Sequence, residues 1–283
     1  MRLHVGCAMW SLASWQGRFL PARLPAGERL RHYASWCTAV EGNTTFYATP
    51  SRNTAASWAA QTDPAFRFVP KLPKVVTHDR RFVGVDAELR AFFDAVEPLG
   101  SRVDAVWVQL PGAFTPVDVP ALGTFLAGLP DVHRYAVEVR HPAFFTDRRA
   151  ADLLERALAP VRAEWVPFDT TTFFATSPGS DAERDAWMKK PRLPARRRAL
   201  TERPIVRYLG RDDAEVTARG WREWVDVVTG WLGEGRSPTM FIHTPDNADA
   251  PALARRFHDE VRARVPALDP MPESIPAQPL TLF

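Results

Sequence analysis

The chain has little cysteine, and this narrows the classes of protein to which it can belong. Cys7 and Cys37 are its only cysteines, and neither lies in a CxxC or other metal-binding spacing. A small secreted domain held together by disulfides needs more cysteine pairs, so we expect two reduced thiols, as is usual in the cytosol. The sequence therefore indicates a cytoplasmic location.

Long apolar runs and a strong net charge are also missing. No stretch approaches the roughly 20 apolar residues that a membrane-spanning helix needs. The N-terminal "MRLHVGCAMW" lacks the basic-then-apolar pattern of a signal segment. The net charge is +3, from 36 basic and 33 acidic side chains, so it does not by itself indicate nucleic acid. We expect no membrane partner.

Several motifs that mark cofactor or nucleophile chemistry are absent. There is no GxGxxG or Walker loop, so the sequence carries no nucleotide-cofactor motif, and there is no GxSxG. HxH, HExxH and DxD spacings are missing too, so we do not favour a metal. A mixed nitrogen and oxygen metal site could still be drawn from His141, His243, Glu138 and Asp169. The cofactor therefore has no assignment from the sequence.

Short apolar runs alternate with amphipathic segments along the chain. Its 283 residues, 46% of them apolar, suffice for a large core. Eight runs are typical of strands, and most intervals hold one helical pattern. These runs cover residues 2–10, 39–47, 66–73, 104–111, 134–141, 164–170, 204–210 and 239–245. The alternation predicts an α/β fold, and the count favours a (β/α)8 barrel of the TIM type over an open doubly wound sheet.

Two segments depart from this alternation. Residues 171–203 follow the sixth run and form a loop that is long for a barrel connection. Residues 266–283 contain five prolines, which is typical of an extended tail. We therefore predict a single-domain barrel over residues 1–265 and a proline-rich extended C-terminal tail over residues 266–283.

Polar residues gather where the expected strands end. In "VEGNTTFY", residues 40–47, Glu41 and Asn43 would share one face of a strand, as would Glu138 and Arg140 in "AVEVRH". The carboxyl ends of barrel strands and the loops after them form the active face. We therefore predict a ring of substrate-binding residues, consisting of Asn43, Lys71, His78, Gln109, Arg140, His141, Asp169, Arg207 and His243.

The chemistry of this ring indicates an anionic ligand. Lys71, Arg140 and Arg207 bring three cations to the predicted mouth, which favours a phosphate or carboxylate group. Glu41 and Glu138 are the candidate catalytic acid and base of a hydrolase or lyase. Two alternatives are open: the charges can be internal ion pairs that close the barrel top, or the protein can bind a ligand without catalysis.

A nucleic-acid contact is a second hypothesis, based on residues 187–203. This segment reads "WMKKPRLPARRRALTER", in which cations that suit phosphates follow an aromatic ring that suits base stacking. The candidate contacts are Lys189, Lys190, Arg192, Arg196, Arg197 and Arg198. The alternative is a solvated, mobile loop without a partner.

The last six residues, "QPLTLF", suggest a partner of their own. They are similar to the Q-L-x-L-F peptides that bind the sliding clamp of bacterial DNA replication and repair, with one extra residue after the glutamine. Gln278, Leu280, Leu282 and Phe283 would then make the contacts. The alternative is that this end folds back and packs on the barrel.

Five short motifs, in order, resemble those of a known family. They are "GCAMW", "VEGNTTFY", "FRFVPKLPKVVTH", "VWVQLP" and "YAVEVRHPAFF", and the match runs through most of residues 2–257. They are similar to the YecE-like family, also called domain of unknown function seventy-two. The resemblance implies a TIM-type barrel but supplies no reaction. It marks as the family's polar ring Glu41, Asn43, Lys71, His78, Gln109, Glu138, Arg140 and His141.

The sequence departs from the family pattern in three places. The seventh strand usually reads R-x-H-G, whereas residues 207–210 read "RYLG" and lack the histidine. The first loop usually has a small hydroxyl residue where "CAM" stands at residues 7–9. The eighth strand usually ends in asparagines, whereas His243 and Thr244 stand here. We therefore expect no mechanism that rests on a strand-seven histidine.

Overall fold

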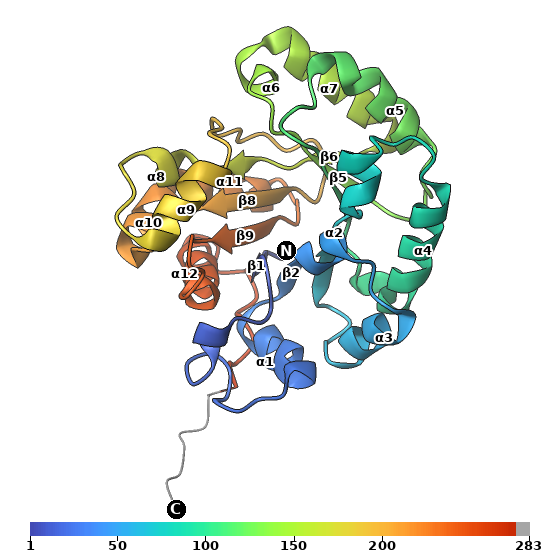
Figure 1. Cartoon of the computed structure of the whole chain (residues 1–283). Coiled ribbons are helices and arrows are strands. Elements are labelled where there is room, and N and C mark those ends of the chain that lie inside the picture. Colours follow the sequence, from blue (N-terminus) through green and yellow to red (C-terminus); the bar gives the residue numbers. More distant parts are fainter. Residues whose placement is uncertain (276–283) are drawn as a thin grey trace, which may run out of the picture.

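Short parallel strands lie inside a ring of helices in the computed structural model, which describes residues 1–275 (Figure 1). The strands are β1 (His4–Cys7), β2 (Ala39–Gly42), β3 (Arg67–Pro70), β4 (Val106–Gln109), β5 (Tyr135–Glu138), β6 (Glu164–Trp165), β7 (Phe168–Asp169), β8 (Ile205–Leu209) and β9 (Thr239–His243). The helices are α1 (Arg29–Trp36), α2 (Asn43–Tyr47), α3 (Arg52–Ala60), α4 (Asp86–Val96), α5 (Val119–Ala127), α6 (Ala143–Thr146), α7 (Arg148–Leu158), α8 (Thr171–Phe174), α9 (Asp181–Lys189), α10 (Ala214–Gly220), α11 (Arg222–Gly233) and α12 (Ala250–Arg262).

The strands form two parallel sheets. A six-stranded sheet has the order β3-β2-β1-β9-β8-β7, and a three-stranded sheet has the order β4-β5-β6. Each of the eight predicted runs contains a strand, and the sixth contains two short ones, β6 and β7. The parallel α/β fold is confirmed, whereas a closed eight-stranded barrel is not, because the main sheet is open.

A proline lies at each of the two junctions between the sheets, which are β3 to β4 and β6 to β7. The carbonyl oxygen of Pro167, between β6 and β7, accepts from the Arg207 amide at 3.0 Å, but proline has no N–H to return. On the edge of β3, the Leu72 amide donates to Trp107 at 3.0 Å. Pro70 has its nitrogen on that same side and cannot donate, since alternate residues face the same neighbour. Each proline thus removes one ladder hydrogen bond at a junction.

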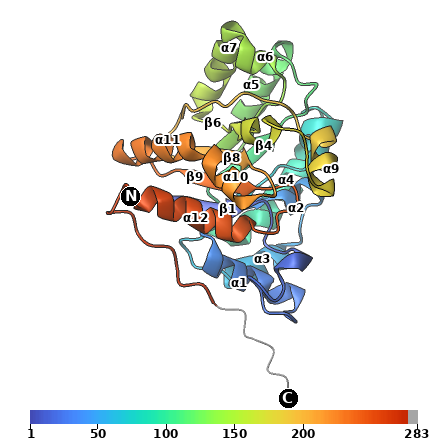
Figure 2. The same ribbon diagram turned by 90° about the vertical axis from the view of Figure 1, so that its left-hand side faces the viewer.

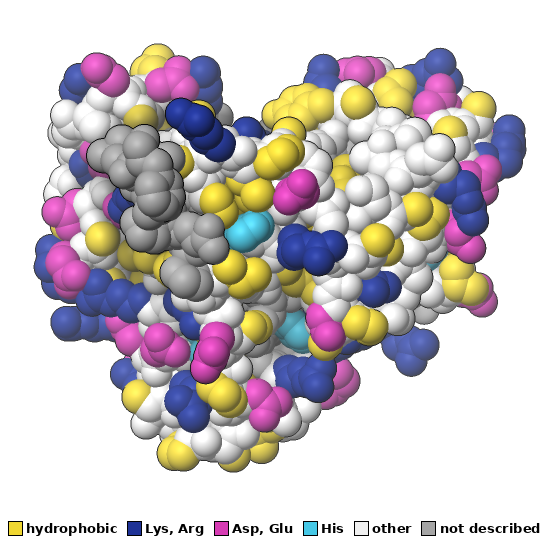
Figure 3. All heavy atoms as spheres, turned by 90° about the horizontal axis from the view of Figure 1, so that it is seen from below, with side chains coloured by type: hydrophobic (Ala, Val, Ile, Leu, Met, Phe, Trp, Pro, Cys, Tyr) yellow, Lys and Arg dark blue, Asp and Glu magenta, His cyan; other side chains and the backbone are white. Residues whose placement is uncertain are grey.

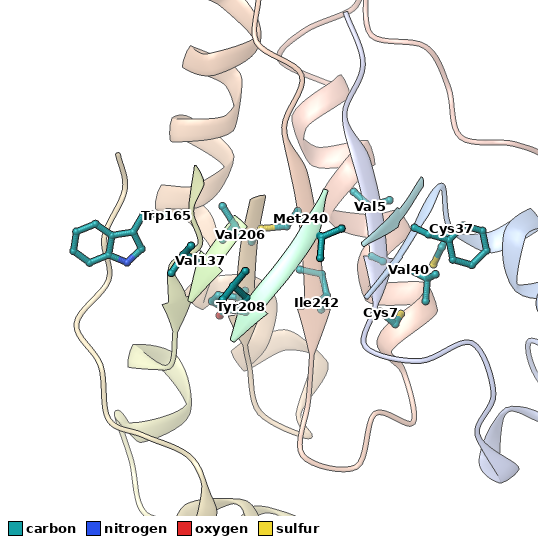
Figure 4. Close-up of a cluster of buried hydrophobic side chains, with 14 of the residues drawn as sticks. Val5, Cys7, Cys37, Val40, Val137, Trp165, Val206, Tyr208, Met240 and Ile242 are labelled. Carbon is teal, nitrogen blue, oxygen red and sulfur yellow. The ribbon is translucent and has the colours of Figure 1, made fainter. Parts of the chain in front are cut away.

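The outer side chains of the strands pack against the helices. Figure 4 shows Val5, Cys7, Val40, Met240 and Ile242 in one buried layer. Alternate residues of a strand face opposite sides, and strands covered on both faces are apolar on both. Both cysteines are buried and free in this layer.

A second, smaller core lies on the inner side of the strands. It takes alternate residues from both sheets, with the Trp107 and Phe241 rings 6.0 Å apart between their centroids. Its members are Ala39, Val69, Ala105, Trp107, Ala136, Val166, Ile205 and Phe241. The strands of the two sheets therefore enclose one common interior.

The second predicted strand ends earlier than its sequence pattern indicates. Residues 43–47 form helix α2 rather than the end of a strand. The Thr45 hydroxyl lies 2.9 Å from the Gly42 carbonyl and 2.7 Å from the Lys71 carbonyl and shares its one hydrogen between them, which favours the turn. Asn43 therefore does not share a strand face with Glu41, and that expectation was wrong.

The segment after the sixth run is folded rather than a plain loop. It contains α8 and α9, and the hydroxyl of Ser180 caps α9 by accepting from the Glu183 amide at 3.0 Å. Buried Arg211, after β8, binds both carboxylate oxygens of Glu183, at 2.8 and 2.6 Å. Such bidentate pairs fix geometry well. The segment thus holds α9 at the carboxyl ends of the strands (Figure 2).

Part of the predicted tail packs on the rest of the chain. Leu268 and Met271 are buried. The Leu268 carbonyl accepts from Arg262 at 3.1 Å, and the Ile275 amide donates to the Ser35 hydroxyl at 3.0 Å. The division into residues 1–265 and 266–283 stays a prediction. The sliding-clamp hypothesis falls on residues 278–283, which lie outside the described part of the chain.

The described helices are short. The longest is α12, with 13 residues, whereas a membrane crossing takes about 20. No helix within residues 1–275 has both the length and the apolar character that a membrane span requires.

We expect Gly6→Ala to destabilise the protein by about 1–3 kcal/mol, the usual cost of overpacking. Gly6 pairs with Ala39 on the neighbouring strand, and an added Cβ would collide with the Ala39 carbonyl oxygen. Urea unfolding would measure the loss. Gly27→Ala is the matched control, because no atom lies within 4 Å of a Cβ added there. Equal stability of the two variants would contradict the prediction.

Candidate functional site

The inner side of the strands changes from apolar to polar towards their carboxyl ends. Inward positions recur every second residue, so the next inward residue lies two positions along. Two positions beyond Ala39, Val69, Trp107, Ala136, Ile205 and Phe241 stand Glu41, Lys71, Gln109, Glu138, Arg207 and His243. All of these polar residues are buried. The sequence-predicted polar ring is therefore brought together at these six positions.

One half of this polar layer is built around Glu41. The Lys71 ammonium lies 2.6 Å from Glu41 Oε1, and the Arg207 Nε lies 3.1 Å from Glu41 Oε2. The same ammonium donates to Gln109 Oε1 at 2.8 Å, which joins β3 to β4 across the sheet junction. Lys71 and Glu41 are 1% and 0% exposed, so neither charge is balanced by solvent.

The other half is built around Glu138. Arg140 Nε donates to Glu138 Oε1 at 2.5 Å, and Arg207 Nη1 lies 4.0 Å from Glu138 Oε2. Arg207 thus stands between the two carboxylates. We call Lys71, Glu41, Arg207, Glu138 and Arg140 the charge cluster, in which positive and negative groups alternate.

Two aromatic rings lie against cations of the charge cluster. The Lys71 ammonium lies 4.6 Å from the Trp107 ring centroid, and the Arg207 guanidinium lies 4.4 Å from the Phe168 centroid. A ring face attracts a cation and excludes water. Sequence reasoning did not assign these rings to the site, although the two-residue spacing from Val166 places Phe168 on the inner side.

Both carboxylates of the charge cluster are held ionised. Burial acts to raise the pKa of Glu41, but Arg207 and Lys71 outweigh it and hold that pKa below its ordinary value. Burial likewise acts to raise the pKa of Glu138, and Arg140, Arg207 and Lys71 outweigh it. The two glutamates therefore serve as fixed negative charges at neutral pH.

The pKa values of the nitrogen bases Lys71 and His243 are lowered as well, which for a base favours the neutral form. Burial lowers the pKa of Lys71 to about 8, although Glu41 opposes this effect. Burial and the nearby Arg207 lower the pKa of His243 well below its ordinary value, so its imidazole is neutral. His243 Nε2 accepts from Arg207 Nη2 at 2.9 Å, which places the remaining imidazole proton on Nδ1.

Lys190 feels the charges of this cluster, while its predicted contact with nucleic acid stays a prediction. It follows directly on α9 and is half-buried. Burial, Arg207 and Arg140 lower its pKa to about 8, while Glu41 and Glu138 oppose them. Sequence reasoning missed this placement because Lys190 comes from a different segment than the strand ends, and only the fold of α9 brings it there.

Asn43, His78 and His141 are among the predicted ligand residues that lie outside the charge cluster. Asn43 donates from Nδ2 to the Ala8 carbonyl at 2.9 Å and so fixes the first loop. His78 Nδ1 lies 2.8 Å from the Thr77 hydroxyl, and burial with Arg140 lowers the pKa of His78 to about 4. His141 Nδ1 accepts from the Ala143 amide at 3.2 Å. His78 is thus near Arg140, whereas Asn43 and His141 hold loops.

Asp169 faces away from the site, contrary to expectation. Its Oδ2 accepts from the Trp224 Nε1 of α11 at 2.7 Å, and its Oδ1 accepts from the Thr171 amide at 2.9 Å. Because Phe168 points inward, the next residue must point towards the outer helices. Asp169 therefore joins β7 to α8 and α11, and the metal ligand set that included it is not assembled.

Most cations of the basic segment, residues 187–203, form ion pairs or ring contacts within the chain. Lys189 pairs with Asp185 at 2.5 Å, and Arg197 pairs with Glu223 at 2.6 Å. Arg196 and Arg198 both pair with Glu155, at 2.9 and 3.0 Å. Arg192 lies over the Trp187 ring at 4.6 Å. A nucleic-acid contact stays a prediction, and these pairs reduce the free charge on which it rests.

Positive and negative side chains are mixed over the surface shown in Figure 3. Lys and Arg alternate there with Asp and Glu, so neither sign gathers on that face. Within residues 1–275, His, Cys, Asp and Glu form no group of three or more that could hold a metal ion.

Comparison with known proteins places the chain in a family. The family model described as "Protein of unknown function DUF72" matches residues 4–278. The chain is 34% identical to UPF0759 protein YecE of Escherichia coli O157:H7, over 98% of both chains. The strain K12 protein of the same name is also 34% identical over 98% of both chains.

Two solved structures of DUF72 family proteins have the same fold. One, from Thermotoga maritima MSB8, is 20% identical, with a TM-score of 0.69 over 93% of this chain and 100% of its own. Another, from Enterococcus faecalis V583, is 16% identical, with a TM-score of 0.64 over 94% of this chain and 98% of its own. The family model and the 34% identity to the E. coli relatives show that this chain belongs to the DUF72 family of proteins of unknown function.

Proposed function

We propose that the protein binds a small anionic, phosphate-bearing ligand at the carboxyl ends of its strands. The observation that carries this proposal is the excess of positive charge in a largely buried site. Within residues 1–275, the site has four cations, Lys71, Arg140, Arg207 and Lys190, against the two carboxylates of Glu41 and Glu138. The neighbouring His78 and His243 are neutral because burial and nearby cations lower their pKa values.

Arg140 and Lys190 are the groups that would contact the ligand. Arg140 uses Nε for Glu138 and is partly exposed, and its two terminal nitrogens are further donors. Within residues 1–275, Lys190 has no acidic partner within ion-pair distance, although it is half-buried. A guanidinium and an ammonium together suit a phosphate, which offers several acceptor oxygens. Lys71 and Arg207 lie deeper and add to the positive field.

The lysines, rather than the glutamates, are the better candidates for proton transfer. General acid–base groups work best when their pKa lies near the working pH. The pKa values of Lys71 and Lys190 are lowered to about 8, whereas the cations hold Glu41 and Glu138 ionised. In a hydrolase or lyase reaction at this site, we therefore assign Glu41 and Glu138 to positioning the cations. A ligand that is bound without reaction would use the same contacts.

We further propose that the two sheets act as one barrel wall around this site. The inner core draws on strands of both sheets, and the Lys71–Gln109 hydrogen bond crosses from β3 to β4. Two isolated bridges also join these edges, at Phe68–Val103 and Lys71–Trp107. A common wall keeps the cluster rigid, and rigid cations bind an anion without the entropy cost of ordering their side chains.

The test is a calorimetric titration of the protein with inorganic phosphate at pH 7. We expect Lys190→Gln and Arg140→Gln each to weaken phosphate binding about tenfold, or about 1.4 kcal/mol. Lys189→Gln is the matched control, because this neighbouring lysine pairs with Asp185 on the surface. Binding to the unmodified protein should also weaken above pH 8, since the pKa of Lys190 is about 8 and only its ammonium form attracts an anion.

Two outcomes would contradict the proposal. Equal weakening by Lys189→Gln and Lys190→Gln would mean that phosphate responds to general surface charge. Unchanged binding in both Lys190→Gln and Arg140→Gln would place the anion elsewhere. Lys190→Gln is the safer of the two variants, because removing Arg140 also leaves the buried Glu138 without its closest partner.

A further inference from the structure

Lysine is scarce in this chain. Only four of its 36 basic side chains are lysines, and the others are arginines. An arginine stays charged at any working pH, whereas a lysine can lose its proton and then act as a nucleophile. The four lysines are Lys71, Lys74, Lys189 and Lys190. The surroundings of each amine therefore decide whether it can react with a ligand.

Three of these amines are held by carboxylates. Lys74 and Lys189 are largely exposed, and each pairs with an aspartate on the surface, at 3.1 and 2.5 Å. Lys71 is 1% exposed, and its ammonium lies 2.6 Å from Glu41, so it is out of reach of a ligand in solution. Within residues 1–275, Lys190 alone among the lysines has no acidic partner within ion-pair distance.

The backbone beside Lys190 is fixed at the carboxyl end of β7. Thr170, which follows this strand directly, donates from its hydroxyl to the Pro191 carbonyl at 3.0 Å. The same hydroxyl accepts from the Leu193 amide at 3.1 Å, and both Thr170 and Leu193 are buried. The Lys190 amide donates to the Ala186 carbonyl of α9 at 2.9 Å. Lys190 thus has a defined place between the end of α9 and the end of β7.

Two arginines of the charge cluster lie at the same strand end. The guanidinium groups of Arg140 and Arg207 lie 5.7 and 4.4 Å from the ring centroid of Phe168, which is two residues before Thr170. Burial and these cations lower the pKa of Lys190 to about 8, whereas an ordinary lysine has a pKa of about 10.4. At pH 8 about half of the Lys190 side chains are therefore neutral amines.

An unpaired amine that is partly neutral suits a ligand with a carbonyl group. A neutral lysine amine adds through its lone pair to the carbon of an aldehyde or ketone. Both amine protons then leave with the carbonyl oxygen as water, and the product is an imine, or Schiff base. No oxidant or reductant is consumed, so the amine and the carbonyl compound are sufficient.

We propose that Lys190 forms an imine with a small phosphorylated aldehyde or ketone, whose phosphate is bound by Arg140. This inference rests on the anion binding proposed above and adds the class of ligand. The new bond joins Nζ of Lys190 to the carbonyl carbon, and the bond between that carbon and its oxygen breaks. The ammonium form of Lys190 attracts the phosphate, and the neutral form reacts.

The experiment traps the imine by reduction. The full chain is incubated at pH 8 with glyceraldehyde 3-phosphate and cyanoborohydride, whose hydride adds to the imine carbon and leaves a stable secondary amine. Peptide mass spectrometry then locates the label. We expect Lys190 to carry about tenfold more label than Lys74 or Lys189, because its amine is unpaired and partly neutral.

Two related compounds separate imine formation from anion binding. Glycerol 3-phosphate has the phosphate without the carbonyl, and we expect calorimetry to show that it binds. Glyceraldehyde has the carbonyl without the phosphate, and we expect it to label Lys190 about tenfold less than its phosphate ester does. Arg140→Gln should lower labelling by the phosphate ester by a similar factor. Arg148→Gln is the matched control, because Arg148 is 94% exposed on the surface.

The possible failures can be told apart. If glycerol 3-phosphate binds but Lys190 is labelled no more than Lys74 and Lys189, the imine proposal is wrong while anion binding stands. If neither phosphate compound binds, the proposed anion site itself is wrong. Label on Lys71 in place of Lys190 would also overturn the proposal. All of these results come from the unmodified chain, so they do not depend on whether Arg140→Gln folds.

Discussion

Replacing Lys71 with methionine is expected to lower the free energy of unfolding by about 3–5 kcal/mol at pH 7, the usual cost of breaking a buried ion pair. Lys71 and Glu41 are almost fully buried, with 2.6 Å between ammonium and carboxylate. Methionine has a similar length but no charge, so Glu41 would keep only Arg207, which is shared with Glu138. Gln109 Oε1 would also lose its donor.

The origin of that loss can be isolated with a double variant. In Glu41→Gln with Lys71→Met, no buried charge remains at this pair, so we expect most of the lost stability to return. Urea unfolding of the original chain, both single variants and the double variant gives the coupling energy. Lys189→Met is a surface control, because exposed ion pairs such as Lys189–Asp185 contribute about 0–1 kcal/mol.

The pH dependence gives an independent check on the same variant. Without Lys71, burial should raise the pKa of Glu41, so the deficit of Lys71→Met should shrink as the pH falls and Glu41 takes up a proton. A loss below about 1 kcal/mol, or a double variant no more stable than Lys71→Met, would show that the pair is not a source of stability. The role of the Lys71–Glu41 pair would then be in ligand binding rather than in stability.

The period of two along each strand was sufficient to predict most of the charge cluster. Glu41, Lys71, Glu138 and Arg207 each lie two positions beyond an apolar inward residue, and the strands themselves were visible as apolar runs. The pattern also contains the reason for the error at Asp169. Counting in twos from the inward Val166 puts Phe168 on the inner side and Asp169 on the outer side. The position of Asp169 at a strand end does not by itself tell which side of the sheet it faces.

Turn chemistry and long-range packing were harder to predict. Residues 43–47 contain two threonines and two aromatics, which favour a strand by propensity. The hydrogen bonds from the Thr45 hydroxyl to Gly42 and Lys71 favour the helical turn instead, and one of them needs β3 in place. Lys190 is a similar case, because its position depends on the Arg211–Glu183 pair that anchors α9.

The closed barrel was predicted from the number of strands, but a strand count does not determine ladder continuity. Pro70 and Pro167 were visible in the sequence, within two of the predicted runs. A proline inside a strand removes a ladder donor and is an argument for a sheet edge. Weighing those two residues would have predicted the two junctions at which the six-stranded and three-stranded sheets meet.

The second large effect expected is loss of stability in acid, before the carboxylates of the charge cluster take up protons. Burial is the main cause that lowers the pKa of His4, His78, His243 and His258, and for His4 the value is about 4. In the unfolded chain each imidazole titrates near pH 6.5. Between about pH 6.5 and 4, the unfolded state therefore binds more protons, and stability falls as the pH is lowered.

His4 alone should contribute roughly 2–3 kcal/mol of this loss by pH 4.5, since one unit of pKa shift corresponds to about 1.4 kcal/mol. Below about pH 4.5, the lowered pKa values of Glu41 and Glu138 extend the loss, because their stabilising charge is neutralised as the pH falls through those values. The two groups thus act in successive pH windows. Acid unfolding should begin with the histidines and not with the ion pairs.

Urea unfolding between pH 7.5 and 4.5, at constant ionic strength, tests this order. In His4→Gln the decline of unfolding free energy with pH should be shallower by roughly 2–3 kcal/mol over that range, because the side chain no longer binds a proton. His141→Gln is the control, since His141 is only half-buried and holds a loop amide. If the curves of His4→Gln and the original chain run parallel, the imidazole of His4 is not the group that titrates. The acid sensitivity in this range would then have to come from His78, His243 or His258, whose pKa values are also lowered by burial.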